Sequence, residues 1–385
     1  MKWVTAWGNA TSIAEHKVES YARDVTLRYP VTCALGGNKI RLHFSNFCGT
    51  ESVRLDCVTV AYASGDRGID SQSAMVVTFG GSECVDIPAG EEIFSDEVPF
   101  SVKPGSVLSI SVYLRGFTLM RSAVVITGPL SKGFYSVGNR ALSTTLPLDY
   151  TRTINTFYFL TGVDVFTEDS AKCIICYGDS ITAQSYPDYL SMLFAKGGSD
   201  TAVIRRAASG TRVLREYKCI TYESYGLKGS NRFEREIACV SGAEAVIIQQ
   251  GINDIIHPVG VEVNPFRPMS DLPTLGELEA GICEYVDVAK KYNLDVYLGT
   301  LLPINGWRTY APFREKMRQG FNEWVRSLKG EVGVIDFDKA VRSFEDKTSF
   351  ASGNDSGDHL HPSERAYALM ADEAFAEIQK HKKKV

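Results

Sequence analysis

Four short segments of the chain carry polar groups of the types used in acyl-transfer chemistry. The first is Gly178-Asp179-Ser180, which follows the apolar run 173–177. Such a run is typical of a buried parallel strand, and the glycine permits a sharp turn after it. A serine near the start of the following helix would lie beside free backbone N–H groups, which favour negative charge on a reacting oxygen. A serine that only caps the helix is the alternative interpretation.

The second segment, 355–362, holds two aspartates and two histidines before an amphipathic pattern that predicts a helix over 363–378. Asp358 and His361 are three residues apart. The carboxylate can therefore accept a hydrogen bond from Nδ1–H of the imidazole and leave Nε2 free to take a proton. His359 is expected to point elsewhere. The alternative is a polar loop that caps the helix.

The third and fourth segments place hydrogen-bond donors after two further apolar runs. Asn253 lies in Gly251-Ile252-Asn253-Asp254, beyond the run 245–248, and Gly210 lies beyond the run 202–204. A side-chain amide or a backbone N–H at such a position can stabilise an oxyanion, whereas an ordinary turn is the alternative for Gly210. Ligands of open parallel sheets bind outside the carboxyl ends of the strands, so we expect the four segments to meet in one crevice.

In chain order the four segments are Gly178-Asp179-Ser180, Ser209-Gly210, Gly251-Ile252-Asn253-Asp254 and 355–362. Together they resemble the four blocks of the SGNH hydrolases, also called the GDSL esterase/lipase family, over about residues 172–380. The resemblance implies that Ser180 is the nucleophile and that Asp358 and His361 complete a catalytic triad. It also implies an oxyanion hole formed by the backbone N–H groups of Ser180 and Gly210 and the side chain of Asn253. The implied reaction is ester hydrolysis through an acyl-enzyme, which requires no metal or organic cofactor.

The elements that must position these residues follow a βα rhythm. Helices are predicted over 275–291 and 313–328, and strands over 294–301 and 333–337. Strands separated by helical stretches indicate a parallel sheet covered on both faces, so we expect a three-layer α/β/α catalytic domain over 169–385.

The first part of the chain has a different pattern. Apolar and polar residues alternate with a period of two over 39–44, 53–60 and 107–114, and glycine- and proline-containing turns separate these segments. Regularly spaced short strands predict an antiparallel β-sandwich, of jelly-roll type, over 1–168. Segments 36–46 and 87–96 also resemble the β-rich domain that precedes the catalytic domain in one subgroup of GDSL esterases.

The architecture of a jelly roll beside an SGNH domain resembles that of carbohydrate esterases that remove acetyl groups from plant polysaccharides. We therefore expect a small-molecule or oligosaccharide ester as substrate, with acetyl esters of carbohydrates first. Trp307 and Tyr310, in the loop 303–310, are candidates for substrate contacts, although packing is the commoner role of a loop tryptophan. A second loop that could shape the pocket is 257–271.

Three alternatives to a sugar esterase stay open at this point. One is a lipid esterase or lysophospholipase of the same family, which would need an apolar groove for the acyl chain. Another is a non-catalytic carbohydrate-binding protein. The third is a metal-dependent phosphoesterase built on Asp179, Asn253, Asp254 and His361.

Composition limits the partners and the compartment. A formal net charge of −5 gives no sign of a nucleic-acid or membrane-surface partner. No apolar stretch approaches the roughly 20 residues needed to span a bilayer. Nine cysteines without a repeated spacing fit reduced thiols, and the first residues lack the apolar core of a secretory signal. We therefore expect a cytoplasmic protein. The sequence leaves its oligomeric state open.

Overall fold

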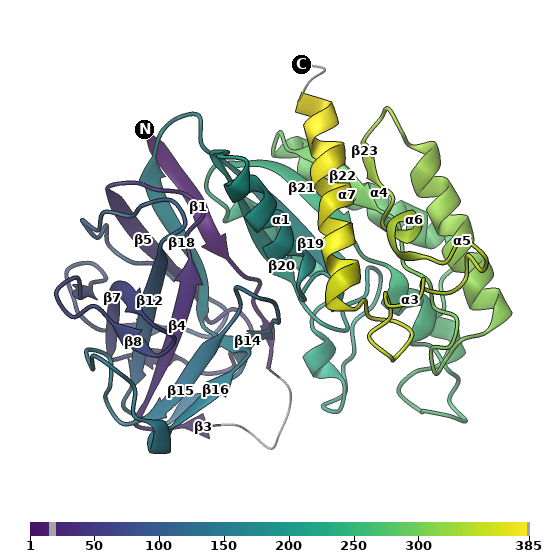
Figure 1. Cartoon of the computed structure of the whole chain (residues 1–385). Coiled ribbons are helices and arrows are strands. Elements are labelled where there is room, and N and C mark those ends of the chain that lie inside the picture. The colour runs from purple at the N-terminus through teal and green to yellow at the C-terminus, as the bar shows by residue number, and fades with distance from the viewer. Residues whose placement is uncertain (15–20, 383–385) are drawn as a thin grey trace. The chain divides into compact units, whose positions relative to one another are not determined.

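The computed structural model describes residues 1–14 and 21–382 and divides into two compact units (Figure 1). The first unit comprises Met1–Cys173 with Gly198–Ile204, and the second comprises Ile174–Gly197 with Arg205–Val385. The predicted folding domains, 1–168 and 169–385, stay a prediction. None of the described helices is long and apolar enough to cross a membrane.

The first unit consists mostly of short strands, and every strand pairing described there is antiparallel. One sheet has the order β1-β18-β5-β11 and a larger one has the order β16-β15-β4-β12-β7-β8, with β9 also on β7. Their strands are β1 (Lys2–Gly8), β4 (Val25–Thr32), β5 (Lys39–Ser45), β7 (Cys57–Ser64), β8 (Gly68–Ile69), β9 (Met75–Val77), β11 (Glu92–Phe94), β12 (Val107–Leu114), β15 (Gly133–Val137), β16 (Thr151–Ile154) and β18 (Leu160–Thr167).

Smaller sheets complete this unit. Their strands are β2 (Ser12–Ile13), β3 (Tyr21–Ala22), β6 (Val53–Leu55), β10 (Val85–Ile87), β13 (Thr118–Leu119), β14 (Ser122–Val125) and β17 (Thr156–Tyr158), and the turn η1 covers Leu148–Tyr150. The strand predicted over 53–60 is interrupted at Asp56, whose carboxylate accepts the Arg115 N–H at 2.8 Å. The region is thus β-rich and antiparallel, and the jelly-roll arrangement stays a prediction.

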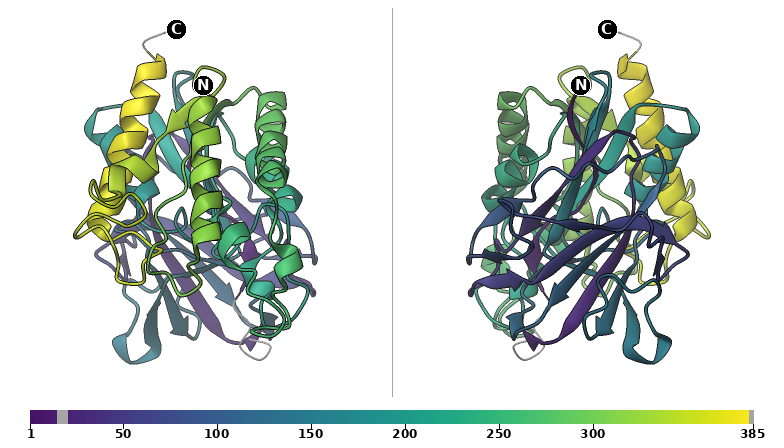
Figure 2. Two further views of the ribbon diagram at one scale, coloured as in Figure 1. Left: turned by 90° about the vertical axis from the view of Figure 1, so that its right-hand side faces the viewer. Right: turned by 90° about the vertical axis from the view of Figure 1, so that its left-hand side faces the viewer.

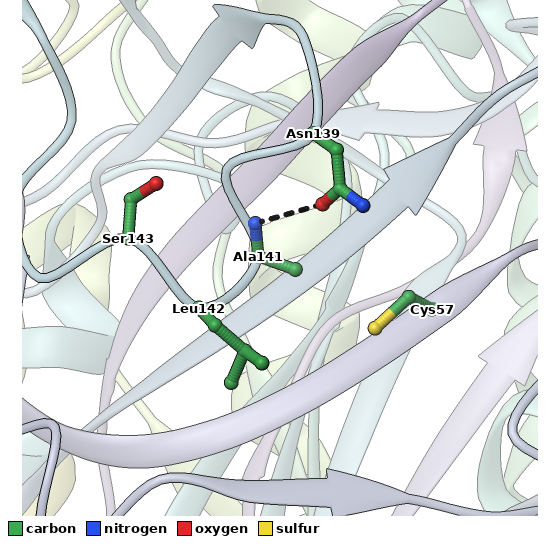
Figure 3. Close-up of a pocket in the computed structure, with 5 residues that line it drawn as sticks. All are labelled: Cys57, Asn139, Ala141, Leu142 and Ser143. Carbon is green, nitrogen blue, oxygen red and sulfur yellow. Dashed lines mark hydrogen bonds between the residues drawn. The ribbon is translucent and has the colours of Figure 1, made fainter.

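A cavity of about 390 Å³ opens in the first unit (Figure 3). It is lined by Cys57, Asn139, Ala141, Leu142 and Ser143. The loop that forms one wall is held by Arg28 of β4, which is fully buried and donates hydrogen bonds to the carbonyl oxygens of Arg140, Ala141 and Ser143. Burial lowers the pKa of Arg28 to about 10. A buried cation solvated by backbone carbonyls keeps this loop in one conformation.

The second unit is built on a five-stranded sheet of order β20-β19-β21-β22-β23, in which β22 pairs in parallel with both β21 and β23. The strands are β19 (Lys172–Gly178), β20 (Thr201–Ala207), β21 (Ala243–Gln249), β22 (Asp295–Gly299) and β23 (Gly333–Ile335). Cys173 and Cys176 of β19 are fully buried, as expected for core thiols.

Helices cover both faces of this sheet. In Figure 1, α1 (Tyr186–Lys196) and α7 (Glu364–Lys382) lie in front of the strands, and α4 (Leu275–Lys291) lies behind them. Figure 2 shows α7 and α4 from the side, on opposite faces of the unit. The other helices are α2 (Gly229–Ala238), α3 (Ile252–Ile256), α5 (Pro312–Ser327) and α6 (Phe337–Val341), with short turns η2 (Glu223–Tyr225) and η3 (Met269–Asp271).

The predicted helices and strands of this unit are present with small shifts at their ends. Helix α4 covers the predicted range, and its start is fixed by Thr274, which forms a capping box with Glu277. A parallel sheet between two helical layers directs the loops that follow β19, β20 and β21 to one edge of the sheet, where the four polar segments lie.

Candidate active site

The turn that carries Ser180 is tight, and the atoms around Gly178 leave no room for a side chain at that position. A β-carbon at Gly178 would collide with the hydroxyl of Thr182 and with the carbonyl oxygen of Gln249 on the neighbouring strand. Ser180 then begins a single helical turn in which the Ala183 N–H donates to the Asp179 carbonyl at 2.9 Å. Ser180 was expected near the start of the following helix, but α1 begins only at Tyr186, so the serine lies in this isolated turn before the helix.

Asp179, next to Ser180 in the sequence, is buried and supports the turn. Its carboxylate accepts the Ile181 N–H at 3.0 Å. Burial raises the pKa of Asp179 to about 7, and the nearby carboxylate of Asp254 adds to this rise. Burial therefore favours the neutral, protonated form of this carboxyl group.

The hydroxyl of Ser180 is connected to Asp358 through His361. Nε2 of His361 lies 2.9 Å from Oγ of Ser180, and Nδ1 lies 2.6 Å from Oδ2 of Asp358. The other carboxylate oxygen of Asp358 accepts the backbone N–H groups of Leu360 and His361 at 2.9 and 2.8 Å. Partial burial raises the pKa of Asp358, but the hydrogen bonds from His361 and from these backbone groups outweigh it and lower the pKa to about 2.

His359 has a carboxylate partner of its own and does not reach the serine through the described contacts. Its Nδ1 lies 2.5 Å from Oδ2 of Asp355, and the residue has a left-handed backbone with φ of 64°. Its ring packs against Gly306, where a β-carbon would lie 2.6 Å from Cγ of His359. Two histidine–aspartate pairs are thus interleaved on one loop, and His361 is the one bonded to Ser180.

The structure brings the third and fourth segments, which contain Asn253 and Gly210, together. The side-chain amide of Asn253, on α3, donates to the carbonyl oxygen of Thr211 at 3.1 Å. The carboxylate of Asp254 accepts the N–H groups of Val213 and Leu214 at 2.8 and 3.1 Å. An amide nitrogen carries two N–H groups, and the bond to Thr211 uses one of the two on Asn253.

Gly210 lies at the start of this loop, with φ of 76° and partial exposure to solvent. A left-handed conformation of this kind favours glycine. Gly210 directly precedes Thr211, whose carbonyl oxygen accepts the Asn253 amide, so the two candidate donors lie on segments that are bonded to each other. Ser180 is likewise partly exposed, so a substrate can approach its hydroxyl.

The carboxylates invoked for a metal site are engaged in other bonds. Both oxygens of Asp254 accept backbone N–H groups, and Asp179 supports the serine turn. Within the described part of the chain, no three His, Cys, Asp or Glu side chains are grouped so that they could hold a metal ion.

Aromatic residues that sequence reasoning missed lie against the segment that contains Gly210. The ring of Tyr225 is 5.0 Å from that of His257, 5.7 Å from that of Tyr217 and 5.6 Å from that of Tyr222. Burial lowers the pKa of His257 well below its ordinary value, and the nearby arginines, Arg267 first, add to this effect. His257 is therefore a neutral ring. The tyrosine-rich run 217–225 was the one sequence feature that could have indicated this aromatic cluster, but it matches no motif.

The loop 303–310 lies against both the histidine loop and α3. Gly306 packs on the ring of His359, and the hydroxyl of Thr309 donates to the Ile256 carbonyl at 3.0 Å. Trp307 is half-buried, with the guanidinium of Arg308 4.7 Å from its ring. No described contact joins Trp307 or Tyr310 to the serine, so their substrate roles stay predictions.

A family model, described as the GDSL-like Lipase/Acylhydrolase family, matches residues 176–369. The chain belongs to this family, whose members are ester hydrolases. No curated protein sequence matches the chain.

Several solved structures resemble a little over half of the chain. A GDSL-like lipase from Bacteroides thetaiotaomicron is 16% identical, with a TM-score of 0.39 over 55% of this chain and 89% of the lipase. An acetylxylan esterase from Geobacillus stearothermophilus is 20% identical, with a TM-score of 0.41 over 54% of this chain and 94% of the esterase. A lipolytic G-D-S-L protein from Veillonella parvula is 17% identical, with a TM-score of 0.40 over 55% of this chain and all of that protein.

Proposed function

We propose that this protein is a serine esterase that cleaves carboxylic esters through an acyl-enzyme. The observation that carries the proposal is the continuous hydrogen-bonded chain from Ser180 through His361 to Asp358. A serine hydroxyl is a weak nucleophile unless a neighbouring base removes its proton, and Nε2 of His361 is within reach to do so.

The reaction proceeds in two acyl transfers. Oγ of Ser180 attacks the ester carbonyl while His361 takes the hydroxyl proton, and His361 then returns this proton to the departing alcohol oxygen. Water repeats the sequence on the acyl-enzyme, releases the acid and restores the serine. Asp358, ionised through the neutral pH range, orients the ring and stabilises the imidazolium.

The negative charge on the carbonyl oxygen is stabilised by three donors in this proposal. The N–H groups of Ser180 and Gly210 and the second amide N–H of Asn253 converge on that oxygen. Such preorganised donors stabilise the transition state more than the substrate.

For the substrate we propose acetyl esters of carbohydrates. The support is the loop 303–310, which carries Trp307 and Tyr310 and packs on the histidine loop, where the departing alcohol is protonated. Aromatic faces next to this position offer a platform for a sugar ring.

A lipid ester is the second candidate, and it is favoured by exposed apolar side chains on the loops that follow β20 and α3. Ile220 is 60% exposed, Val263 75% and Phe266 49%. The two loops are joined where the Asn264 amide donates to the Tyr222 hydroxyl at 2.6 Å. Apolar side chains on joined loops near an esterase serine would favour long acyl chains.

Initial rates on p-nitrophenyl esters from acetate to palmitate, measured beside acetylated oligosaccharides, test both substrate classes. Ser180→Ala is the blank for enzyme-independent hydrolysis. Preference for acetate with release of acetic acid from the sugars supports the first candidate. Activity that rises with chain length overturns it in favour of the second.

The same assay distinguishes the proposed serine esterase from a metal-dependent phosphoesterase. Activity is expected to survive prolonged EDTA treatment and to be abolished by an organophosphorus reagent that phosphorylates Ser180. Inactivation by EDTA with recovery on adding zinc or manganese would contradict the serine mechanism.

A further inference from the structure

The side chain of Tyr225 lies closer than any other described side chain to the position that a β-carbon of Gly210 would occupy. A β-carbon at Gly210 would lie 2.5 Å from both Cγ and Cδ1 of Tyr225 and 2.9 Å from its Cβ. The tyrosine ring therefore lies against the α-carbon of Gly210, on the side that a side chain would occupy. Gly210 cannot move toward Tyr225 without a clash.

Tyr225 is itself held in place by its surroundings. It ends the turn η2 (Glu223–Tyr225), where its N–H donates to the Tyr222 carbonyl at 3.0 Å. Its ring packs between the rings of Tyr217, Tyr222 and His257. Tyr217 is buried, with the guanidinium of Arg212 4.3 Å from its ring. Tilted aromatic contacts of this kind resist displacement in several directions.

The same aromatic contacts reach the other oxyanion donor. His257 is the C-cap residue directly after α3, and its N–H donates to the carbonyl oxygen of Asn253 at 3.1 Å. Tyr225 therefore touches Gly210 on one side and, through His257, the helix that carries Asn253 on the other. The Asn253–Thr211 hydrogen bond links these two segments directly.

We propose that Tyr225 is a positioning residue of the oxyanion hole, a role that rests on the serine esterase function proposed above. Its ring sets the place of the Gly210 N–H relative to the amide of Asn253. The contacts come from the ring and not from the hydroxyl, so phenylalanine is expected to replace tyrosine. Displacing a donor by a fraction of an ångström weakens stabilisation of the oxyanion, whereas substrate binding is hardly affected.

The test compares Tyr225→Phe and Tyr225→Ala in the full chain, with thermal unfolding to confirm that each variant folds. Tyr225→Phe is expected to keep kcat within about twofold. Tyr225→Ala is expected to lower kcat by about tenfold with KM within about twofold. A trifluoromethyl ketone forms a tetrahedral adduct with the serine, and Tyr225→Ala should weaken its inhibition by the factor lost in kcat. Tyr222→Ala removes a ring of the same cluster and is the matched control, with a smaller expected loss.

A double-mutant cycle with Gly210→Ala tests the contact itself. The added methyl meets the tyrosine ring, so Gly210→Ala should cost at least about threefold less in kcat when Tyr225 is already alanine. Equal costs in the two backgrounds would overturn the proposal. An unchanged kcat in Tyr225→Ala would also overturn the proposal, provided that Ser180→Ala is inactive. A lowered kcat without weaker inhibition by the ketone would overturn it under the same condition. If Ser180→Ala kept full activity, the esterase function and this role would both be wrong.

Discussion

Nε2 of His361 lies 2.9 Å from the hydroxyl oxygen of Ser180, although the two residues are 181 positions apart in the sequence. The serine turn after β19 and the loop before α7 must both fold before this hydrogen bond exists. The hydrogen bond between Ser180 and His361 therefore forms only in the fully folded second unit, and neither segment can form it alone.

Ser180→Ala and His361→Ala are each expected to lower kcat to near background, because a nucleophile and its base act as one unit. The double variant should be no slower than either single variant. Steady-state kinetics on p-nitrophenyl acetate provide the measurement. His359→Ala is the matched control on the same loop and should keep kcat within about tenfold; loss of turnover in this variant but not in His361→Ala would identify His359 as the base.

Asp358→Asn is expected to reduce kcat by about 10³–10⁴ with KM nearly unchanged. Asparagine can still accept the backbone N–H groups of Leu360 and His361 with its oxygen. Its NH₂ group would then face Nδ1 of His361 and force the proton onto Nε2, the atom that must accept the serine proton. Asp355→Asn changes the other pair and should have a much smaller effect; similar losses in both variants would refute the assignment of Asp358.

Asn253→Ala is expected to slow kcat by about 10²–10³ with little change in KM, because the amide acts on the transition state. Asn231→Ala, an exposed asparagine on α2, is the control. The hydrogen bond to Thr211 is also lost in Asn253→Ala, so circular dichroism must show an intact fold. A folded Asn253→Ala variant with a wild-type kcat would exclude the amide from the oxyanion hole.

The free energy of unfolding should depend on pH through Asp179. Its pKa is raised from 3.8 to about 7 in the folded protein, so the folded state binds the proton more tightly than the unfolded state does. Stability from this group is therefore present at acid pH and declines as pH rises from about 4 to about 7, by a few kcal/mol at most. Urea unfolding of wild type and Asp179→Asn at pH 5 and pH 7.5 measures the effect. Asp179→Asn should show the smaller decline, and equal declines would contradict the buried acid.

Sequence patterns predicted the catalytic elements well where periodicity and strand ends carried the signal. The polar segments around Ser180, Gly210 and Asn253 each follow a buried strand of one sheet, as expected. Asp358 and His361 are bonded as their spacing indicated. These features follow from local chemistry, and the parallel topology brings them together.

Other features depend on contacts between distant segments and could not be predicted. Gly178 was expected to permit a sharp turn, and Thr182 in that turn does lie close to it, but the equally close approach of Gln249 on the neighbouring strand was not predicted. The contact between Tyr225 and Gly210 depends on how the long loop between β20 and α2 folds back on its own first residues. The delayed start of α1 at Tyr186 was missed because the residues after Ser180 form one isolated turn.

The two interleaved pairs on the histidine loop also affect chemical labelling. His359 is 51% exposed and His361 only 22%, whereas His257 is buried. Diethyl pyrocarbonate, which acylates imidazoles, should therefore consume His359 before His361. A plot of remaining activity against modified histidines would begin with a plateau. The loss of activity would thus lag behind the total loss of unmodified imidazole.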